Sequence, residues 1–115
     1  MIWVSSDKDY QQILEKKNND SLIILFKHST RCPVSSRALQ EVLKFEVVLS
    51  DEYEIIGINV INDRLFSQFI AKETGIRHES PQIIISRNNN VLTSFTHHQI
   101  TSEKLNQSVN SLKNL

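Results

Sequence analysis

The residues with the clearest chemical potential are grouped around Cys32, the only cysteine of this 115-residue chain. Cys32 follows the apolar run 22–26 and precedes a segment with helical spacing of apolar residues, so we expect it at a junction between a strand and a helix. The free amides of a first helical turn and the helix dipole stabilise an anion, and they favour a thiolate there. Pro33 supports this placement, because the N–H that proline lacks would be unpaired at a first helical position.

Two neighbours of Cys32 are candidate binding residues. Ser35 follows Cys32 by three residues on the same helical face, so its hydroxyl is placed to donate a hydrogen bond to the thiolate or to a substrate sulfur. The alternative is a solvated helix serine. Arg31 is placed to stabilise the thiolate or to bind a ligand carboxylate, and the alternative is an exposed loop cation. Without a second cysteine, exchange at Cys32 cannot end in an internal disulfide.

Two stretches of the chain resemble the monothiol bacilliredoxin family. They are 26–35, with the sequence FKHSTRCPVS, and 78–82, with the sequence HESPQ. The likeness in length and motif order extends over nearly the whole chain. It implies a thioredoxin-like fold and a cytosolic thiol-disulfide oxidoreductase that removes bacillithiol from protein mixed disulfides through Cys32. It further implies that Pro81 forms a cis peptide bond facing the thiol, and that the Ser80 backbone pairs with a peptide substrate.

The same resemblance implies bacillithiol as co-substrate, bacillithiolated cytosolic proteins as partners, no bound cofactor and no metal. Bacillithiol carries a malate group with two carboxylates, which a basic rim of Lys27, His28, Arg77 and His78 would suit. For each of these four residues, a solvated surface position is the alternative. The expected substrate-binding residues are Arg31, Pro33, Ser35, Ser80 and Pro81.

Two other functions are compatible with a single cysteine in this setting. One is an iron–sulfur carrier of the monothiol glutaredoxin type, although such proteins typically show Cys-Gly-Phe-Ser where this chain has Cys-Pro-Val-Ser. The other is a noncatalytic thioredoxin-like adaptor in which Cys32 only senses oxidation. The sequence does not separate a sensor from an enzyme.

The length predicts one domain over residues 1–115. Thirteen basic and thirteen acidic residues cancel, so the overall charge favours neither a nucleic-acid nor a membrane partner, and we expect a monomer. No apolar stretch reaches membrane-spanning length, and the first residues do not resemble a secretory signal. These features, together with one unpaired cysteine, predict a cytoplasmic protein.

The pattern of apolar residues predicts an α/β protein in the order βαβαβαββα, with a central mixed sheet flanked by helices, which is the thioredoxin arrangement. The carboxyl end of the second strand then carries Cys32, at the edge where open α/β sheets bind ligands. In the helices, we expect Leu43, Val47 and Leu65 among the residues that face the core. The expected strands are 2–4, 22–26, 53–59, 82–86 and 91–96.

Overall fold

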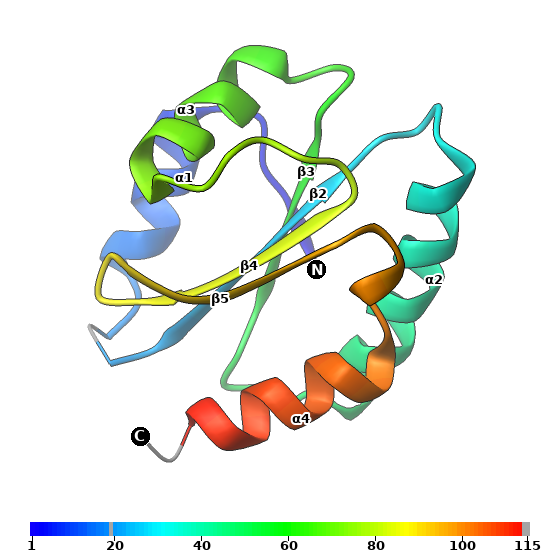
Figure 1. Cartoon of the computed structure of the whole chain (residues 1–115). Coiled ribbons are helices and arrows are strands. Elements are labelled where there is room, and N and C mark those ends of the chain that lie inside the picture. Colours follow the sequence, from blue (N-terminus) through cyan, green and yellow to red (C-terminus); the bar gives the residue numbers. More distant parts are fainter. Residues whose placement is uncertain (19, 114–115) are drawn as a thin grey trace.

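The computed structural model describes residues 1–18 and 20–113 and confirms the expected order of elements (Figure 1). A 3₁₀ turn, η1, is added between the last strand and the last helix. Within the described residues, no helix is both long and apolar enough to cross a bilayer. The elements are β1 Ile2–Trp3, α1 Asp7–Glu15, β2 Leu22–His28, α2 Pro33–Val48, β3 Ile55–Asn59, α3 Arg64–Thr74, β4 Gln82–Arg87, β5 Asn90–Thr96, η1 His97–Gln99 and α4 Ser102–Leu112.

The five strands form one mixed sheet in the order β1-β3-β2-β4-β5, so β2 is central. Strand β2 runs parallel to β3 and antiparallel to β4. In the β2–β4 pair, Lys27 lies opposite Gln82. The carboxyl end of β2 therefore meets the start of β4, and the loops that hold Cys32 and Pro81 leave the sheet at the same edge.

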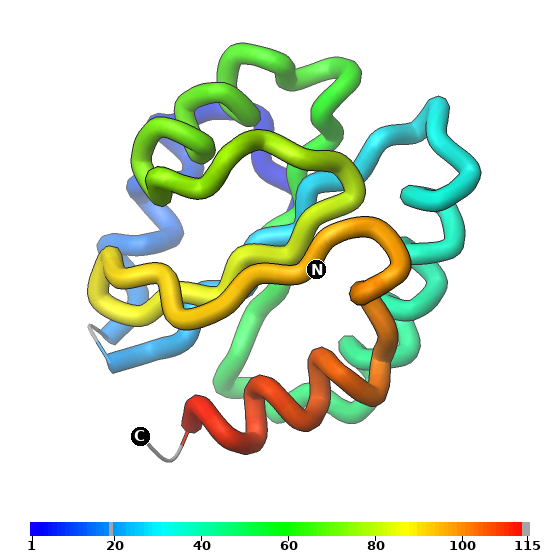
Figure 2. Tube along the Cα trace, viewed as in Figure 1, coloured from blue at the N-terminus to red at the C-terminus, as the bar shows by residue number. Residues whose placement is uncertain are grey.

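Helices cover both faces of the sheet, with α1 and α3 on one side and α2 and α4 on the other (Figures 1 and 2). Successive side chains of a strand point to opposite faces, so β2 contributes to two cores. Leu22, Ile24 and Phe26 belong to the core under α2 and α4. Ile23 and Leu25 belong to the core under α1 and α3. By the same alternation, Lys27 lies on the α3 side and His28 on the α2 side.

Three of the helical residues expected in the core are exposed instead. Leu43 and Val47 of α2 are 38% and 83% exposed, and Leu65 of α3 is 82% exposed. Helix α2 instead buries a narrow stripe that contains Val42 and Phe45. A stripe only about 100° wide is typical of a surface helix. Apolar residues just outside it remain in solvent.

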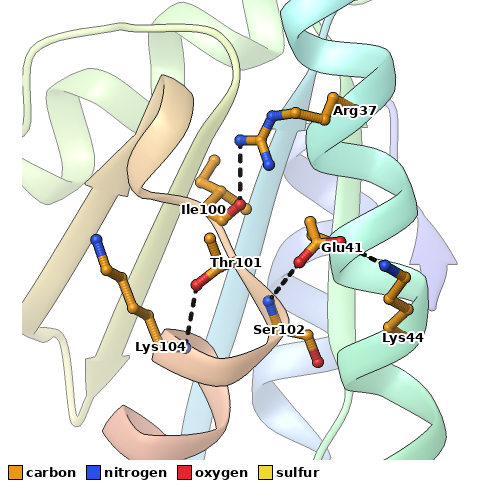
Figure 3. A network of polar contacts seen from close by, with 7 residues as sticks. All are labelled: Arg37, Glu41, Lys44, Ile100, Thr101, Ser102 and Lys104. Atoms are coloured by element: carbon orange, nitrogen blue, oxygen red, sulfur yellow. Dashed lines mark hydrogen bonds and ion pairs between the residues drawn. The ribbon is translucent and has the colours of Figure 1, made fainter.

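Polar contacts hold α2 against the C-terminal part of the chain (Figure 3). The Arg37 guanidinium donates to the carbonyl oxygens of His97 and Ile100, over 3.1 and 3.2 Å. One turn further along α2, the Glu41 carboxylate accepts from the backbone N–H of Ser102 over 3.1 Å. These bonds satisfy backbone groups at the start of α4 and fix the orientation of α2.

Candidate active site

Cys32 is the N-cap residue of α2, as the sequence predicts. Its backbone is extended, with φ −117° and ψ 121°, and Pro33 is the first helical residue. The Cys32 carbonyl accepts the first helical hydrogen bond from Ser36 N–H over 3.0 Å. The thiol is free and partly exposed. A nucleophile in this position is accessible to a second molecule and lies beside the unpaired amides of the first helical turn.

Ser35 does not lie where a solvated serine would. Its side chain is fully buried, and Ser35 Oγ accepts from the backbone N–H of Ser29 over 2.9 Å. Ser35 Oγ also lies 2.7 Å from His28 Nδ1. No hydrogen bond joins it to Cys32 Sγ within the described part of the chain. Because the hydroxyl already accepts from an amide, its one proton is available to a neutral His28. Ser35 thus holds the loop before Cys32 to the end of β2.

His28 is buried between aromatic rings. Its ring stacks on Phe26 at a centroid distance of 5.7 Å and lies 6.0 Å from the ring of Trp3. Burial lowers the pKa of His28, and the hydrogen bond with Ser35 opposes this only in part. The imidazole is therefore neutral near pH 7 and acts as the acceptor that the Ser35 hydroxyl needs. A solvated position, and a place in a basic rim, are both wrong for His28.

Lys27 is also buried, on the opposite side of the sheet. Its side chain is 0% exposed, and its Nζ donates to the carbonyl of Ser67 over 3.1 Å. Lys27 Nζ lies 3.1 Å from His78 Nδ1, and Ser67 Oγ lies 3.2 Å from the same nitrogen. Burial lowers the pKa of Lys27 to about 8. A solvated position is therefore wrong for Lys27.

The predicted basic rim is only partly assembled. The structure brings buried Lys27 and exposed His78 together, whereas Arg77 is exposed and His28 lies on the other face of the sheet. Arg31, which is not part of this rim, is also exposed. Burial and the Lys27 charge lower the pKa of His78, although Glu79 opposes them.

The sequence does not predict the contacts of Ser67 with Lys27 and His78, because Ser67 belongs to no recognisable motif. The alternation of β2 was a usable signal for the burial of Lys27, which shares a face with Ile23 and Leu25.

The peptide bond between Ser80 and Pro81 is cis, which confirms the predicted isomer, and its position facing the thiol stays a prediction. Pro81 is buried, whereas Pro33, the first residue of α2, is exposed. The carbonyl of Pro81 accepts from His97 N–H over 3.1 Å. The Ser80 hydroxyl is buried and has no hydrogen-bond partner among the described residues. Pairing of the Ser80 backbone with a peptide stays a prediction.

The fold and the N-capping cysteine define a thioredoxin-fold redox protein. A solved structure described as a candidate oxidoreductase with a thioredoxin fold is 29% identical, with a TM-score of 0.81 over 94% of this chain and 92% of that chain. The thioredoxin Deadhead of Drosophila melanogaster is 21% identical, with a TM-score of 0.75 over 97% and 99% of the two chains. Fasciola hepatica thioredoxin is 13% identical, with a TM-score of 0.73 over 96% and 98%. The last two likenesses concern the fold alone.

A family match assigns the chain more specifically than the thioredoxin fold does. The family described as "Monothiol bacilliredoxin BrxC" matches residues 3–105. The chain therefore belongs to the monothiol bacilliredoxin family, as its two motifs predict, and a redox function follows from the family and the fold.

Proposed function

We propose that the protein is a monothiol thiol-disulfide oxidoreductase that removes bacillithiol from mixed disulfides on cytosolic proteins. The observation that carries the proposal is the placement of Cys32, a free and partly exposed thiol at the N-cap of α2. The family match supports bacillithiol as the thiol that is transferred. The chain has no other cysteine, so the cycle passes through a mixed disulfide with a second molecule.

The reaction has two exchange steps. In the first, the Cys32 thiolate attacks the bacillithiol sulfur of the mixed disulfide. A new S–S bond forms between Cys32 and bacillithiol, the original S–S bond breaks, and the target leaves as a thiolate that takes up a proton. In the second, the thiolate of free bacillithiol or another thiol attacks the bacillithiol sulfur of the adduct. This step restores the Cys32 thiolate and releases a disulfide.

The proposed surroundings of Cys32 have separate roles. Ser80 and Pro81 contact the target peptide, Arg31 and Pro33 flank the thiol, and Ser35 fixes the loop that carries it. The cycle needs no bound metal or nucleotide, since bacillithiol is itself the co-substrate. We propose a cytoplasmic monomer with bacillithiolated proteins as its partners.

Intact mass spectrometry tests the proposed attack. Reduced protein incubated with a bacillithiolated target should gain the mass of one bacillithiol, which a thiol reductant should remove. Cys32→Ser should gain nothing and should leave the target modified. Ser35→Cys introduces a second thiol at Cys-x-x-Cys spacing, so the adduct should become transient and an internal disulfide should accumulate.

The same experiment separates the competing functions. If the wild-type protein frees the target without ever carrying the adduct, attack by Cys32 on the bacillithiol sulfur is wrong. If neither the adduct nor the freed target appears, an iron–sulfur carrier or a noncatalytic adaptor describes the protein better.

A further inference from the structure

Lys27 is a buried cation without a counter-ion. Its Nζ contacts the Ser67 carbonyl and His78 Nδ1, and no carboxylate lies within ion-pair distance among the described residues. An ammonium has three N–H donors, so one remains available. A buried charge that lacks a partner of opposite sign costs stability. The arrangement is suited to receive an anion.

A hollow of about 350 Å³ lies next to the residues that hold the Lys27 ammonium, and Lys27 itself, which is 0% exposed, is not part of its wall. Ser67 and His78, which both contact Lys27 Nζ, are part of its wall, and Arg64 adds a second cation. None of its described lining residues is acidic. Its volume falls within the range of small-molecule sites. The lining residues are Val60, Ile61, Arg64, Ser67, Gln68 and His78.

The hollow and Cys32 belong to the same edge of the sheet. Val60, in the wall of the hollow, donates its backbone N–H to the carbonyl of His28 over 2.9 Å. His28 ends β2, four residues before Cys32, and its ring contacts Ser35 in the first turn of α2. The hollow therefore lies at the edge of the sheet from which the loop that carries Cys32 leaves.

Gln82 adds further unused hydrogen-bonding capacity. It lies opposite Lys27 across the β2–β4 pair and is 1% exposed. Its amide nitrogen donates to the Arg77 carbonyl, whereas its Oε1 has no partner among the described residues. Unpaired buried polar atoms are uncommon in folded proteins. Because Oε1 is an acceptor, it can pair only with an N–H or O–H group and not with a carboxylate.

We propose that this hollow is a carboxylate subsite that binds the dianionic malate end of bacillithiol. Lys27 supplies a buried point charge, and Arg64 supplies a planar guanidinium able to bind a carboxylate in bidentate fashion. The inference rests on the proposed function, because it names the part of that co-substrate which the protein recognises apart from its sulfur.

Binding of an unreactive analogue tests the subsite. S-methyl bacillithiol has no exchangeable sulfur, so its affinity does not depend on the chemistry of Cys32. Titrated by calorimetry, Lys27→Met should bind it at least about tenfold more weakly than the wild-type protein, the effect of losing one buried charge close to the bound carboxylates. Lys72→Met removes an exposed lysine of the same helix that carries Ser67, and it should bind as the wild type does.

Two further measurements show whether the malate end is responsible. The analogue without malate, S-methyl cysteinyl-glucosamine, should bind equally to wild type and Lys27→Met. Arg64 is exposed, so Arg64→Gln leaves the core unchanged and should also weaken S-methyl bacillithiol selectively. The subsite is wrong if the wild-type protein does not bind S-methyl bacillithiol. It is also wrong if Lys27→Met binds S-methyl bacillithiol as tightly as the wild type does, or if this variant loses the same affinity for both analogues.

Transfer kinetics distinguish this inference from the proposed function. With a bacillithiolated target, Lys27→Met should raise KM and leave kcat near the wild-type value, because the subsite binds the ligand and takes no part in the exchange. An unchanged KM refutes the subsite alone. Lys27-dependent binding of the probe, with no adduct on wild-type Cys32, refutes the proposed function alone.

Discussion

Replacing Lys27 by methionine should stabilise the protein. Burial lowers the pKa of Lys27 from 10.5 to about 8, so keeping this residue charged at pH 7 costs the folded state up to about 3 kcal/mol. Methionine has a similar length and no charge, and it suits an interior position. After allowance for the lost hydrogen bond to Ser67, we expect a gain of about 2 kcal/mol in the free energy of unfolding at pH 7.

The stability difference between Lys27→Met and the wild type should depend on pH in a defined direction. Between pH 8 and 10.5 the unfolded chain holds a proton on Lys27 that the folded chain has released, so wild-type stability gains a positive slope with pH in this window. The advantage of Lys27→Met should therefore be full at pH 7 and should shrink from pH 8 to pH 10. Other titrating groups are common to both proteins and cancel in the difference, apart from His78, whose pKa burial and the Lys27 charge lower from 6.5, so that it titrates below this pH window.

Urea unfolding at pH 7, 8, 9 and 10, followed by circular dichroism, measures the difference directly. The exposed-lysine control, Lys72→Met, should stay within about 0.5 kcal/mol of wild type throughout. The reasoning is refuted if Lys27→Met is less stable than wild type at pH 7, or if its advantage does not change with pH. Either result means that the ammonium is well compensated in the folded protein.

Two more substitutions test the packing around the site. Ser35→Ala leaves Ser29 N–H and His28 Nδ1 unpaired in a buried position, so urea unfolding should show a loss of about 2 kcal/mol. Ser36→Ala, at an exposed position, should cost under about 0.5 kcal/mol, and equal losses would contradict the role given to Ser35. Gly57→Ala brings a Cβ within 2.7 Å of the Trp3 ring, so it should displace that half-exposed ring, change the tryptophan fluorescence and cost about 1 kcal/mol. In a Trp3→Ala background the added cost should nearly vanish, and a cost that persists would mean that the clash with the ring is not its cause.

Local sequence signals account for much of the candidate site. Pro33 marks the start of α2 because its ring and missing N–H suit a first helical turn, and this alone places Cys32 at the N-cap. The cis bond at Pro81 was predicted from the family resemblance. The side-chain contacts were not predicted, because Ser35 meets His28 only when α2 packs on the end of β2.

Helix faces show where local periodicity is insufficient. Leu43 and Val47 have spacing compatible with the core, yet the face of α2 that packs on the sheet is centred on Ala38, Val42 and Phe45, and Leu43 and Val47 lie outside it. The orientation of α2 also depends on Arg37 and Glu41, which contact segments about sixty residues away. Such contacts leave no periodic signal.

The sequence by itself determined the order of the elements, the strand-to-helix junction at Cys32 and the family. These depend on residue types and on spacing along a few turns of chain. Only the tertiary structure decided which charges are buried. The sequence neighbours of Lys27 are both apolar and polar, so they do not indicate whether its side chain is buried. The side chain loses its contact with water because α3 and the loop at His78 cover one face of β2. Burial is a property of the surrounding elements, and it turns an ordinary lysine into a cation that is costly to keep charged.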